Sequence, residues 1–401
     1  MHIAAIAAEP SAGGAYRAEL PMRALGDAGH RAEFCIWDQR DPPPPFERLR
    51  QADVVHMWRL FRAPARQLAR ALRDAGVAVV FDNDDDMTRV PKGSPAYKEM
   101  KGAKDIVAEE LSAMLRLSDL VTTTNGDLAA RLRRLGGDAR VVENYVETGF
   151  VRSRSAAHPH DGVTIGWVAG AEHRGDLREL RLRRTLEALL EQQPHVSLVG
   201  VGLDLGVQSD RYTHIDDVPF PELPDTLARF DIGLAPIADV SFNRVRSNIK
   251  VKEYAAGAIP WLASPIGPYR GLGEEQGGRL VPNHGWAEAL TGLVTDAQAR
   301  ASLAERAAAW GRTQTVVANV GAWEAVFAEA AQRAGRSVSI PSAASGAAPS
   351  AASSPAGAGN GGARPRAIVP RPIAAPEAAQ PAGRDAGAKL RRGLFRRRSS
   401  R

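Results

Sequence analysis

The sequence predicts an α/β protein with two Rossmann-like domains that face each other across a cleft, followed by a disordered tail. Short apolar runs alternate with amphipathic segments, this pattern breaks once and starts again, and the composition changes after residue 336. A chain of 401 residues has room for two domains of about 100–200 residues each. Its 44% hydrophobic content is typical of a soluble globular protein.

The first 150 residues alternate between predicted strands and predicted helices. The strands are expected at 2–7, 32–37, 53–58, 77–81, 119–124 and 139–144. The helices are expected near 16–28, 64–75, 104–117 and 126–135. Strands and helices at this spacing form a parallel sheet with helices on both faces. We therefore expect one Rossmann-like domain over residues 1–150, on the acceptor side of the cleft.

A polar, turn-rich segment over 146–162 interrupts the pattern, which then restarts. Strands are expected at 163–170, 196–202, 231–236 and 259–263, with helices near 177–192, 221–229, 249–256 and from about 285 to 334. We therefore expect a second Rossmann-like domain over residues 151–335, whose final helices pack back. Two such units joined by a polar linker enclose a cleft, where ligands bind in this class of protein.

The tail over residues 336–401 is rich in Ala, Pro, Ser and Gly and ends in KLRRGLFRRRSSR. A segment of this composition buries too little apolar surface to offset its ordering entropy, so we expect disorder. Its Arg-rich end could attract an anionic membrane surface by about 1 kcal/mol per basic residue. The alternative is a solvated terminus without a function.

The charge distribution disfavours a nucleic-acid partner. Residues 341–401 carry 11 basic and 2 acidic residues, a charge of +9, so the remainder carries −3 of the total of +6. A nucleic-acid-binding fold carries its basic excess on the domain itself. Cys35 is the single cysteine, which excludes an intramolecular disulfide and favours a reducing compartment. The chain lacks a signal peptide pattern and a span of about 20 apolar residues, so we expect a cytoplasmic protein, with contact of the tail at the inner face of the membrane left open.

An acidic cluster follows the fourth predicted strand. Residues 81–87, FDNDDDM, place Asp82, Asp84, Asp85 and Asp86 around one Asn. Such a cluster can be a divalent metal site, a solvated acidic turn, or the polar edge of a substrate pocket. Its place at the carboxyl end of a strand puts it at the edge of the sheet that lines the cleft.

The stretch over residues 230–270 is the strongest candidate for a binding site. A strand ends at Pro236, a polar loop follows, and a helix begins near Ser247. A helix N-terminus together with Arg246 and Lys250 suits a diphosphate, and Glu253 could accept hydrogen bonds from two ribose hydroxyls. The alternative is an amphipathic helix whose Lys and Glu are solvated.

The segment FNRVRSNIKVKEYAAGAIPWLAS (242–264) resembles the donor-binding segment of GT-B fold glycosyltransferases of family 4. More narrowly, it resembles a bacterial subgroup with DDD and FN-x3-S-x2-K-x2-EY motifs. The resemblance extends to DNDDDMTRVPKGSP (82–95), SDLVTTTNGDLAARL (118–132), VVENYV (141–146) and IGWVAGAEHRGDL (165–177). It covers most of residues 1–335 and none of the tail.

The resemblance implies roles for individual residues. It implies that Arg246 and Lys250 neutralise the departing nucleotide diphosphate, as catalytic residues, and that Glu253 binds the ribose. The other residues with an implied donor-binding role are Gly13, Gly14, Gly170, His173, Arg174, Asn243 and Ser247. A Gly-Gly loop can equally be a plain turn, and a His-Arg pair can equally be surface. Many family 4 enzymes carry a second Glu eight positions earlier, where this chain has Val245.

The resemblance also implies transfer with retention of configuration and without a metal or other cofactor, because cations and a helix N-terminus can stabilise the diphosphate. We then favour Asp84 and Asp86 as acceptors of hydrogen bonds from sugar or acceptor hydroxyls, with Asp85 helping to remove a proton. The metal site and the acidic turn remain alternatives for this cluster.

Three functions remain after this reasoning. The first is a glycosyltransferase of the hexosyltransferase type, which uses a nucleotide-sugar donor and a sugar, lipid-linked or small-molecule acceptor in polysaccharide, glycolipid or natural-product glycosylation. The second is another GT-B enzyme, such as a sugar-nucleotide epimerase, since a fold alone does not fix the chemistry. The third is a noncatalytic relative that binds a sugar nucleotide or a partner protein, which the residue Val245 supports.

Overall fold

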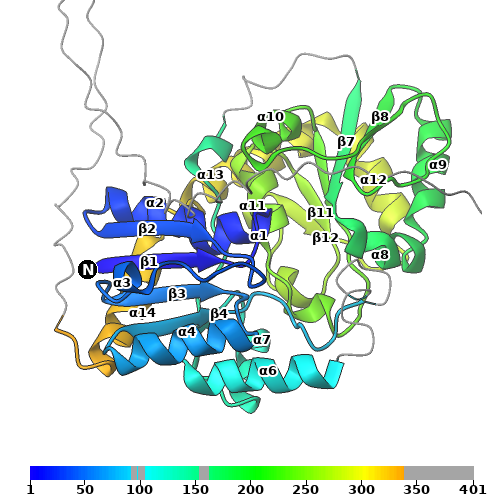
Figure 1. Ribbon diagram of the computed structural model, residues 1–401. Helices are drawn as coiled ribbons and strands as arrows, with labels where there is room; N and C mark the ends of the chain where they lie inside the picture. The colour runs from blue at the N-terminus through cyan, green and yellow to red at the C-terminus, as the bar shows by residue number, and fades with distance from the viewer. Residues whose placement is uncertain (92–96, 98–103, 153–161, 338–401) are drawn as a thin grey trace, which may run out of the picture.

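The computed structural model describes residues 1–91, 97, 104–152 and 162–337. These residues form two lobes, each built around a six-stranded parallel sheet with helices on its faces (Figure 1). The predicted α/β class with two Rossmann-like domains is confirmed. The predicted disordered tail, from residue 338 to its basic end, lies outside the described residues. Most of the predicted linker, residues 153–161, also lies outside them. No helix within the described ranges is long and apolar enough to cross a membrane.

The first sheet has the strand order β2-β1-β3-β4-β5-β6. Its strands are β1 (His2–Ala7), β2 (Arg31–Ile36), β3 (Val54–Trp58), β4 (Ala78–Asp82), β5 (Leu120–Thr123) and β6 (Ala139–Val141). Its helices include α2 (Leu20–Asp27), α3 (Phe46–Leu49), α4 (Ala63–Asp74), α6 (Lys104–Leu117) and α7 (Gly126–Arg134). The buried strands β3 and β4 are paired in parallel with Trp58 opposite Asp82, so both end at the same edge of the sheet.

The helix predicted over 16–28 has a more complex start. A short turn, α1 (Ala12–Gly14), leads into a π-helical turn (Ala15–Glu19) before α2 begins. Such single π-helical turns within helices are frequent at functional sites. Here the turn carries Tyr16 and Arg17, which are both buried. The sequence pattern did not predict the π-helical turn, because the helical spacing of the apolar residues continues unchanged from this turn into α2.

The second sheet has the order β12-β11-β10-β7-β8-β9. Its strands are β7 (Val163–Ala169), β8 (Val196–Gly202), β9 (Tyr212–Ile215), β10 (Ile232–Ala235), β11 (Trp261–Ala263) and β12 (Gly278–Leu280). Its helices include α8 (Arg174–Glu179), α9 (Leu182–Gln192), α10 (Leu223–Leu227), α11 (Ile249–Ala256), α12 (Trp286–Thr295) and α13 (Ala297–Thr313). The two edge strands β9 and β12 were not predicted, since they are short, partly exposed and lack an apolar run.

The single helix predicted over 177–192 is wrong, because the structure has two helices there. α8 ends at Glu179 and α9 begins at Leu182, with Arg181 between them at a left-handed φ of 51°. Leu180 and Leu182 are both buried. The left-handed backbone of Arg181 interrupts the helix between these two buried side chains.

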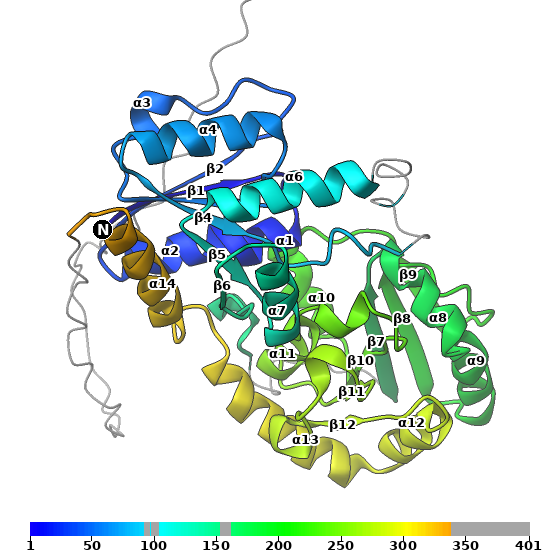
Figure 2. The same cartoon turned by 90° about the horizontal axis from the view of Figure 1, so that it is seen from below.

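The last described helix, α14 (Val320–Arg333), returns to the first lobe. Figure 2 shows it beside the strands of the first sheet, far along the chain from them. Trp323 and Phe327 are buried there in one apolar cluster with residues of β1, β3 and β4. The ring of His56 on β3 meets the ring of Trp323 edge to face, with centroids 5.4 Å apart. The first lobe therefore depends on residues from both ends of the described chain.

Replacing Trp323 with Ala tests this packing. The change removes a large side chain that is 1% exposed, so we expect the free energy of unfolding of the first lobe to fall by about 3–5 kcal/mol. Circular dichroism during urea unfolding measures the loss. The control is Val317→Ala at a side chain that is 52% exposed, where we expect a change below about 0.5 kcal/mol. An unchanged urea midpoint in Trp323→Ala would contradict the packing of α14.

Candidate functional site

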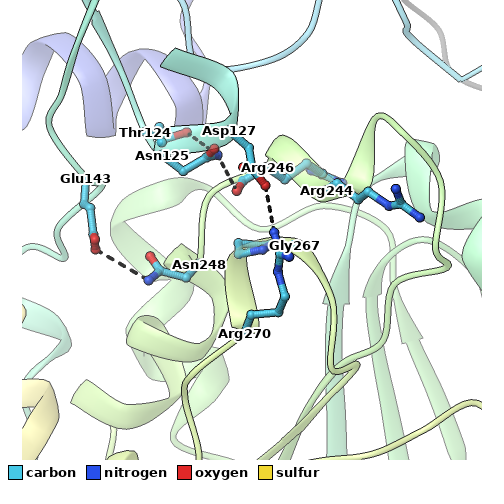
Figure 3. A pocket seen from close by; sticks show the side chains of 11 residues that line it. Thr124, Asn125, Asp127, Glu143, Arg244, Arg246, Asn248, Gly267 and Arg270 are labelled. Atoms are coloured by element: carbon cyan, nitrogen blue, oxygen red, sulfur yellow. Dashed lines mark hydrogen bonds and ion pairs between the residues drawn. The ribbon is translucent and has the colours of Figure 1, made fainter. Parts of the chain in front are cut away.

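Two cavities share Arg246, and the larger one lies where loops of the second sheet approach the first lobe. The larger one measures about 280 Å³ and is lined by Thr124, Asn125, Gly126, Asp127, Glu143, Arg244, Arg246, Asn248, Gly267, Pro268 and Arg270 (Figure 3). The smaller one measures about 50 Å³ and is lined by Trp167, Val168, His173, Ala235, Ile237, Arg246, Ser247, Ile249, Lys250 and Tyr269. Of the predicted donor-binding and catalytic residues, the smaller cavity brings together His173, Arg246, Ser247 and Lys250.

The start of α11 holds the Lys250 and Glu253 side chains side by side. Lys250 Nζ donates to Glu253 Oε2 at 2.9 Å, one turn along the helix. The other oxygen, Oε1, accepts a hydrogen bond of 2.6 Å from the hydroxyl of Tyr16 in the first lobe. Glu253 is buried, and burial together with the Glu253 charge raises the pKa of Tyr16 well above its usual value. Both oxygens of the predicted ribose-binding carboxylate are therefore engaged within the protein.

Arg246 is held by a network of buried groups. Its Nη2 donates to Glu172 Oε1 at 3.0 Å, and its Nη1 lies 2.9 Å from His173 Nε2. Because a guanidinium can only donate, His173 accepts at Nε2 and carries its proton on Nδ1, which donates to Asp176 Oδ2 at 2.7 Å. Burial and the Arg246 charge lower the pKa of His173. A neutral His173 therefore fixes the position of the guanidinium.

The charge of Arg246 also lowers the pKa of Glu172, which favours the charged form of this carboxyl. Burial raises the pKa of this carboxyl, but the charge of Arg246 and its hydrogen bond outweigh that effect and lower the pKa to about 2. Glu172 is therefore ionised throughout the neutral range and neutralises Arg246 in the ligand-free protein. An anionic ligand at this cavity would compete with Glu172 for the guanidinium.

Asn243 and Val245 stabilise the loop before α11. Asn243 Nδ2 donates to Asp176 Oδ1 at 2.7 Å and to the carbonyl oxygen of Ala238 at 2.9 Å. Val245 is fully buried in the apolar cluster of the first lobe. The position where many family 4 enzymes carry a Glu is thus an apolar contact between the lobes. Neither side chain lines the smaller cavity.

The predicted glycines lie where a side chain would collide with the protein. A Cβ on Gly13 would lie 2.8 Å from the ring of Trp58, and one on Gly14 would lie 2.8 Å from the carbonyl oxygen of Glu9. A Cβ on Gly170 would lie 2.3 Å from the carboxylate of Glu172. Close packing therefore accounts for Gly13 and Gly14 without a ligand, whereas the flexible Glu172 carboxylate could move away from a side chain at Gly170. Arg174, at the start of α8, is exposed and lines neither cavity.

The residues of the acidic cluster bind Arg side chains of the first lobe. Arg17 Nη2 donates to the buried Asp82 at 2.6 Å. Asp86 accepts from Arg131 Nη1 at 2.5 Å and from the hydroxyl and backbone N–H of Thr88. Within the described residues, no group of three or more His, Cys, Asp or Glu side chains could hold a metal ion. The arrangement at Asp86 matches the capped acidic turn that the sequence left open.

Arg59, which the sequence analysis missed, holds the other two carboxylates of the cluster. Its Nε donates to Asp84 Oδ1 at 2.7 Å and its Nη2 to Asp85 Oδ2 at 2.6 Å. Its guanidinium lies 4.7 Å from the centre of the Trp58 ring. The backbone of Arg59 is left-handed, with φ 55°, which is strained for a residue other than Gly. Its place directly after the strand DVVHMW was the only available signal.

Asp85 has the most exposed side chain of the three, 23% against 9% for Asp84 and 7% for Asp86. Burial and the Asp84 charge raise its pKa, while the positive charges of Arg59 and Arg246 oppose the rise. The carboxylate of Glu172 adds to the rise. Since Arg246 and Glu172 belong to the second lobe, Asp85 lies in their electric field across the cleft.

Comparison with known proteins identifies the fold. No family model matches the sequence, and no curated protein matches it. The structure resembles sucrose-phosphate synthase from Thermosynechococcus elongatus with a TM-score of 0.58 at 15% identity, over 82% of this chain and 98% of that one. The chain has the GT-B fold.

Other GT-B structures match over a similar length. Anabaena HepE in complex with UDP and glucose matches with a TM-score of 0.58 at 13% identity, over 81% of this chain and 98% of that one. A putative UDP-N-acetylglucosamine 2-epimerase from Listeria monocytogenes matches with a TM-score of 0.51 at 13% identity, over 82% and 98% of the two chains. At these identities the likeness establishes the GT-B fold alone.

Replacing Arg246 with Gln tests the network around this residue. Without the guanidinium, burial is opposed only by weaker effects, so we expect the pKa of Glu172 to rise from about 2 toward its ordinary value of 4.5 or above. Titration of the Glu carboxyl carbons by NMR measures the shift. Arg178→Gln, at an exposed position on α8, is the matched control and should leave this titration unchanged. A Glu172 pKa that stays near 2 in Arg246→Gln would show that other groups hold it.

Proposed function

We propose that the protein is a glycosyltransferase that moves a sugar, of hexose type, from a nucleotide-diphosphate donor to an acceptor hydroxyl. The observation that carries the proposal is the smaller cavity, where Arg246 and Lys250 lie in one wall beside the N-terminus of α11. The GT-B fold supports it, as does the presence of UDP and glucose in the similar HepE structure. The resemblance to family 4 and its pathways, including polysaccharide biosynthesis, belongs to the same proposal.

The charges at the cavity suit the chemistry of transfer. The bond between the anomeric carbon and the diphosphate oxygen breaks, its electron pair stays on the diphosphate, and the acceptor oxygen bonds to the same carbon. Arg246 and Lys250 stabilise the negative charge that develops on the diphosphate, without a metal. We assign the removal of the acceptor proton to Asp85, whose pKa reflects the charges of Arg246 and Glu172 in the second lobe. We propose attack on the face from which the diphosphate leaves, so that configuration is retained and no protein nucleophile takes part.

On donor binding, the diphosphate would replace the carboxylates that pair with Arg246 and Lys250. In the free protein, Glu172 neutralises Arg246 and Glu253 neutralises Lys250. The diphosphate would take over these cations. The carboxylate of Glu253 would then be free to accept hydrogen bonds from the ribose hydroxyls. The protein keeps its cations compensated in both states, which limits the cost of burying them.

Two other functions remain as alternatives. The epimerase-type alternative is favoured by the similarity to the Listeria structure. The noncatalytic alternative is favoured by Val245, which is buried where many family 4 enzymes carry a sugar-binding Glu. Formation of a transfer or hydrolysis product from the donor separates the first function from both of these.

The central test is a panel of UDP-, GDP- and ADP-sugars assayed for hydrolysis and transfer with EDTA present. We expect turnover to survive EDTA and to fall about 100-fold in Lys250→Ala, the order of loss when one group that stabilises a developing negative charge is removed. Arg312→Ala, an exposed cation at the end of α13, is the control and should retain wild-type turnover. Binding of a donor without turnover across acceptors would favour the noncatalytic relative. Loss of donor binding in EDTA would instead restore the metal site.

The role of Glu253 is tested with the nucleoside diphosphate that binds best and with its 2′,3′-dideoxy form. The wild type should bind the ribose form at least about 10-fold more tightly, because each lost hydrogen bond to a charged group weakens binding by this order. In Glu253→Gln we expect the preference to shrink to near unity. Calorimetric titration measures the four affinities. A preference that survives in the variant would show that another group binds the ribose.

A further inference from the structure

The larger cavity adjoins the proposed reaction centre. It shares Arg246 with the smaller cavity, and it is lined from the first lobe by the start of α7 and from the second by the loops around Asn248 and Arg270. Asn125, the N-cap of α7, donates from Nδ2 to the carbonyl oxygens of Val245 and Arg246 at 2.5 and 3.0 Å. These bonds hold the two walls together beside the cations. A molecule in this cavity would therefore lie next to a donor bound at Lys250.

Each charged side chain that lines the larger cavity has an ion-pair partner of opposite charge. Arg270 pairs with Asp127 across the lobes at 2.8 Å, as the dashed line in Figure 3 shows. Arg244 pairs with Asp239 at 2.6 Å, and Arg246 with Glu172 at 3.0 Å. Glu143 pairs with the buried Lys252 at 2.7 Å. The smaller cavity has Arg246 and Lys250 but no acidic side chain in its wall, whereas the larger one carries Asp127 and Glu143 in its own wall, so it favours an anion much less.

The wall is also unusually polar for a ligand site. Small-molecule sites are lined mainly by apolar and aromatic side chains. The described residues that line this cavity include no aromatic side chain, and Pro268 is their one apolar side chain larger than Gly. An aromatic aglycone or an acyl chain would find no surface to stack or pack on. Amide, carboxylate and guanidinium groups at Asn248, Asp127 and Arg270 instead offer both donors and acceptors of hydrogen bonds.

We propose that the larger cavity binds the acceptor and that this acceptor is a neutral sugar. A sugar hydroxyl both donates and accepts, so neighbouring hydroxyls match the paired Asp127 and Arg270. The proposal rests on the proposed transferase function. In the transfer, one hydroxyl oxygen of the bound sugar bonds to the anomeric carbon of the donor. The bond from that carbon to the diphosphate breaks with its electron pair on the diphosphate, and the hydroxyl proton passes to Asp85.

An acceptor panel tests the proposal with the donor that the wild type hydrolyses. The neutral arm holds glucose, N-acetylglucosamine, lactose and cellobiose; the anionic arm holds glucose 6-phosphate and glucuronic acid; the aromatic arm holds 4-nitrophenol. We expect transfer to a neutral sugar with kcat/KM at least about 10-fold above that of either other arm, which corresponds to about 1.4 kcal/mol. Preference for the phosphate, the uronic acid or the phenol overturns the proposal. Donor hydrolysis without transfer to any neutral sugar also overturns it.

Two variants locate the binding. Arg270→Gln and Asp127→Asn each break the exposed pair at the cavity, so each should raise the KM for the neutral sugar at least 5-fold more than the KM for the donor, an effect on the order of one lost hydrogen bond. Arg279→Gln breaks a similar exposed pair with Glu274 away from the cavity and is the matched control. A larger effect on the donor KM would show that the cavity holds the donor. Failure of the wild type to bind or hydrolyse any nucleotide sugar would instead count against the transferase itself.

Discussion

The buried ion pair of Arg17 and Asp82 is the interaction on which the rest of the structure depends. Both side chains are fully buried, and Nη1 of Arg17 also donates to the carbonyl oxygen of Val142 at 2.5 Å. The guanidinium lies 4.8 Å from the centre of the Trp323 ring. One side chain thus connects the π-helical turn, the end of β4, the chain leaving the first sheet and α14. Removing one partner of such a pair costs about 3–5 kcal/mol, because the other charge stays buried.

The fold could be predicted from the sequence because the central strands are continuous runs of buried apolar residues. The hydrogen-bond partners of the site residues could not be predicted. The spacing of apolar residues located β1, β3, β4 and α11. The pairing of Arg59 with Asp84 and Asp85 joins residues 25 and 26 positions apart, and no local pattern encodes it. The motif around Glu253 pointed to the segment that supplies Arg246, Ser247 and Lys250 to the smaller cavity. It could not show that Tyr16 reaches this carboxylate from the other lobe.

The ligand-free site is an internally neutralised one. Glu172 and Glu253 take the places on Arg246 and Lys250 that a diphosphate would take. Preorganised cations stabilise a developing charge best when they need not move, and His173 fixes Arg246 without adding a charge of its own. Under the proposed function, the affinity for a donor would reflect the difference between two anionic partners and not the full attraction of the cations.

The two segments that pass between the lobes lie together. The N–H of Val146 donates to the carbonyl oxygen of Gln314, and the N–H of Val316 donates to that of Val146, each at 2.9 Å. A single flexible connection would let the lobes twist as well as open. Two connections joined by backbone hydrogen bonds attach the lobes at one place and restrict the twist of one lobe against the other more than a single connection would.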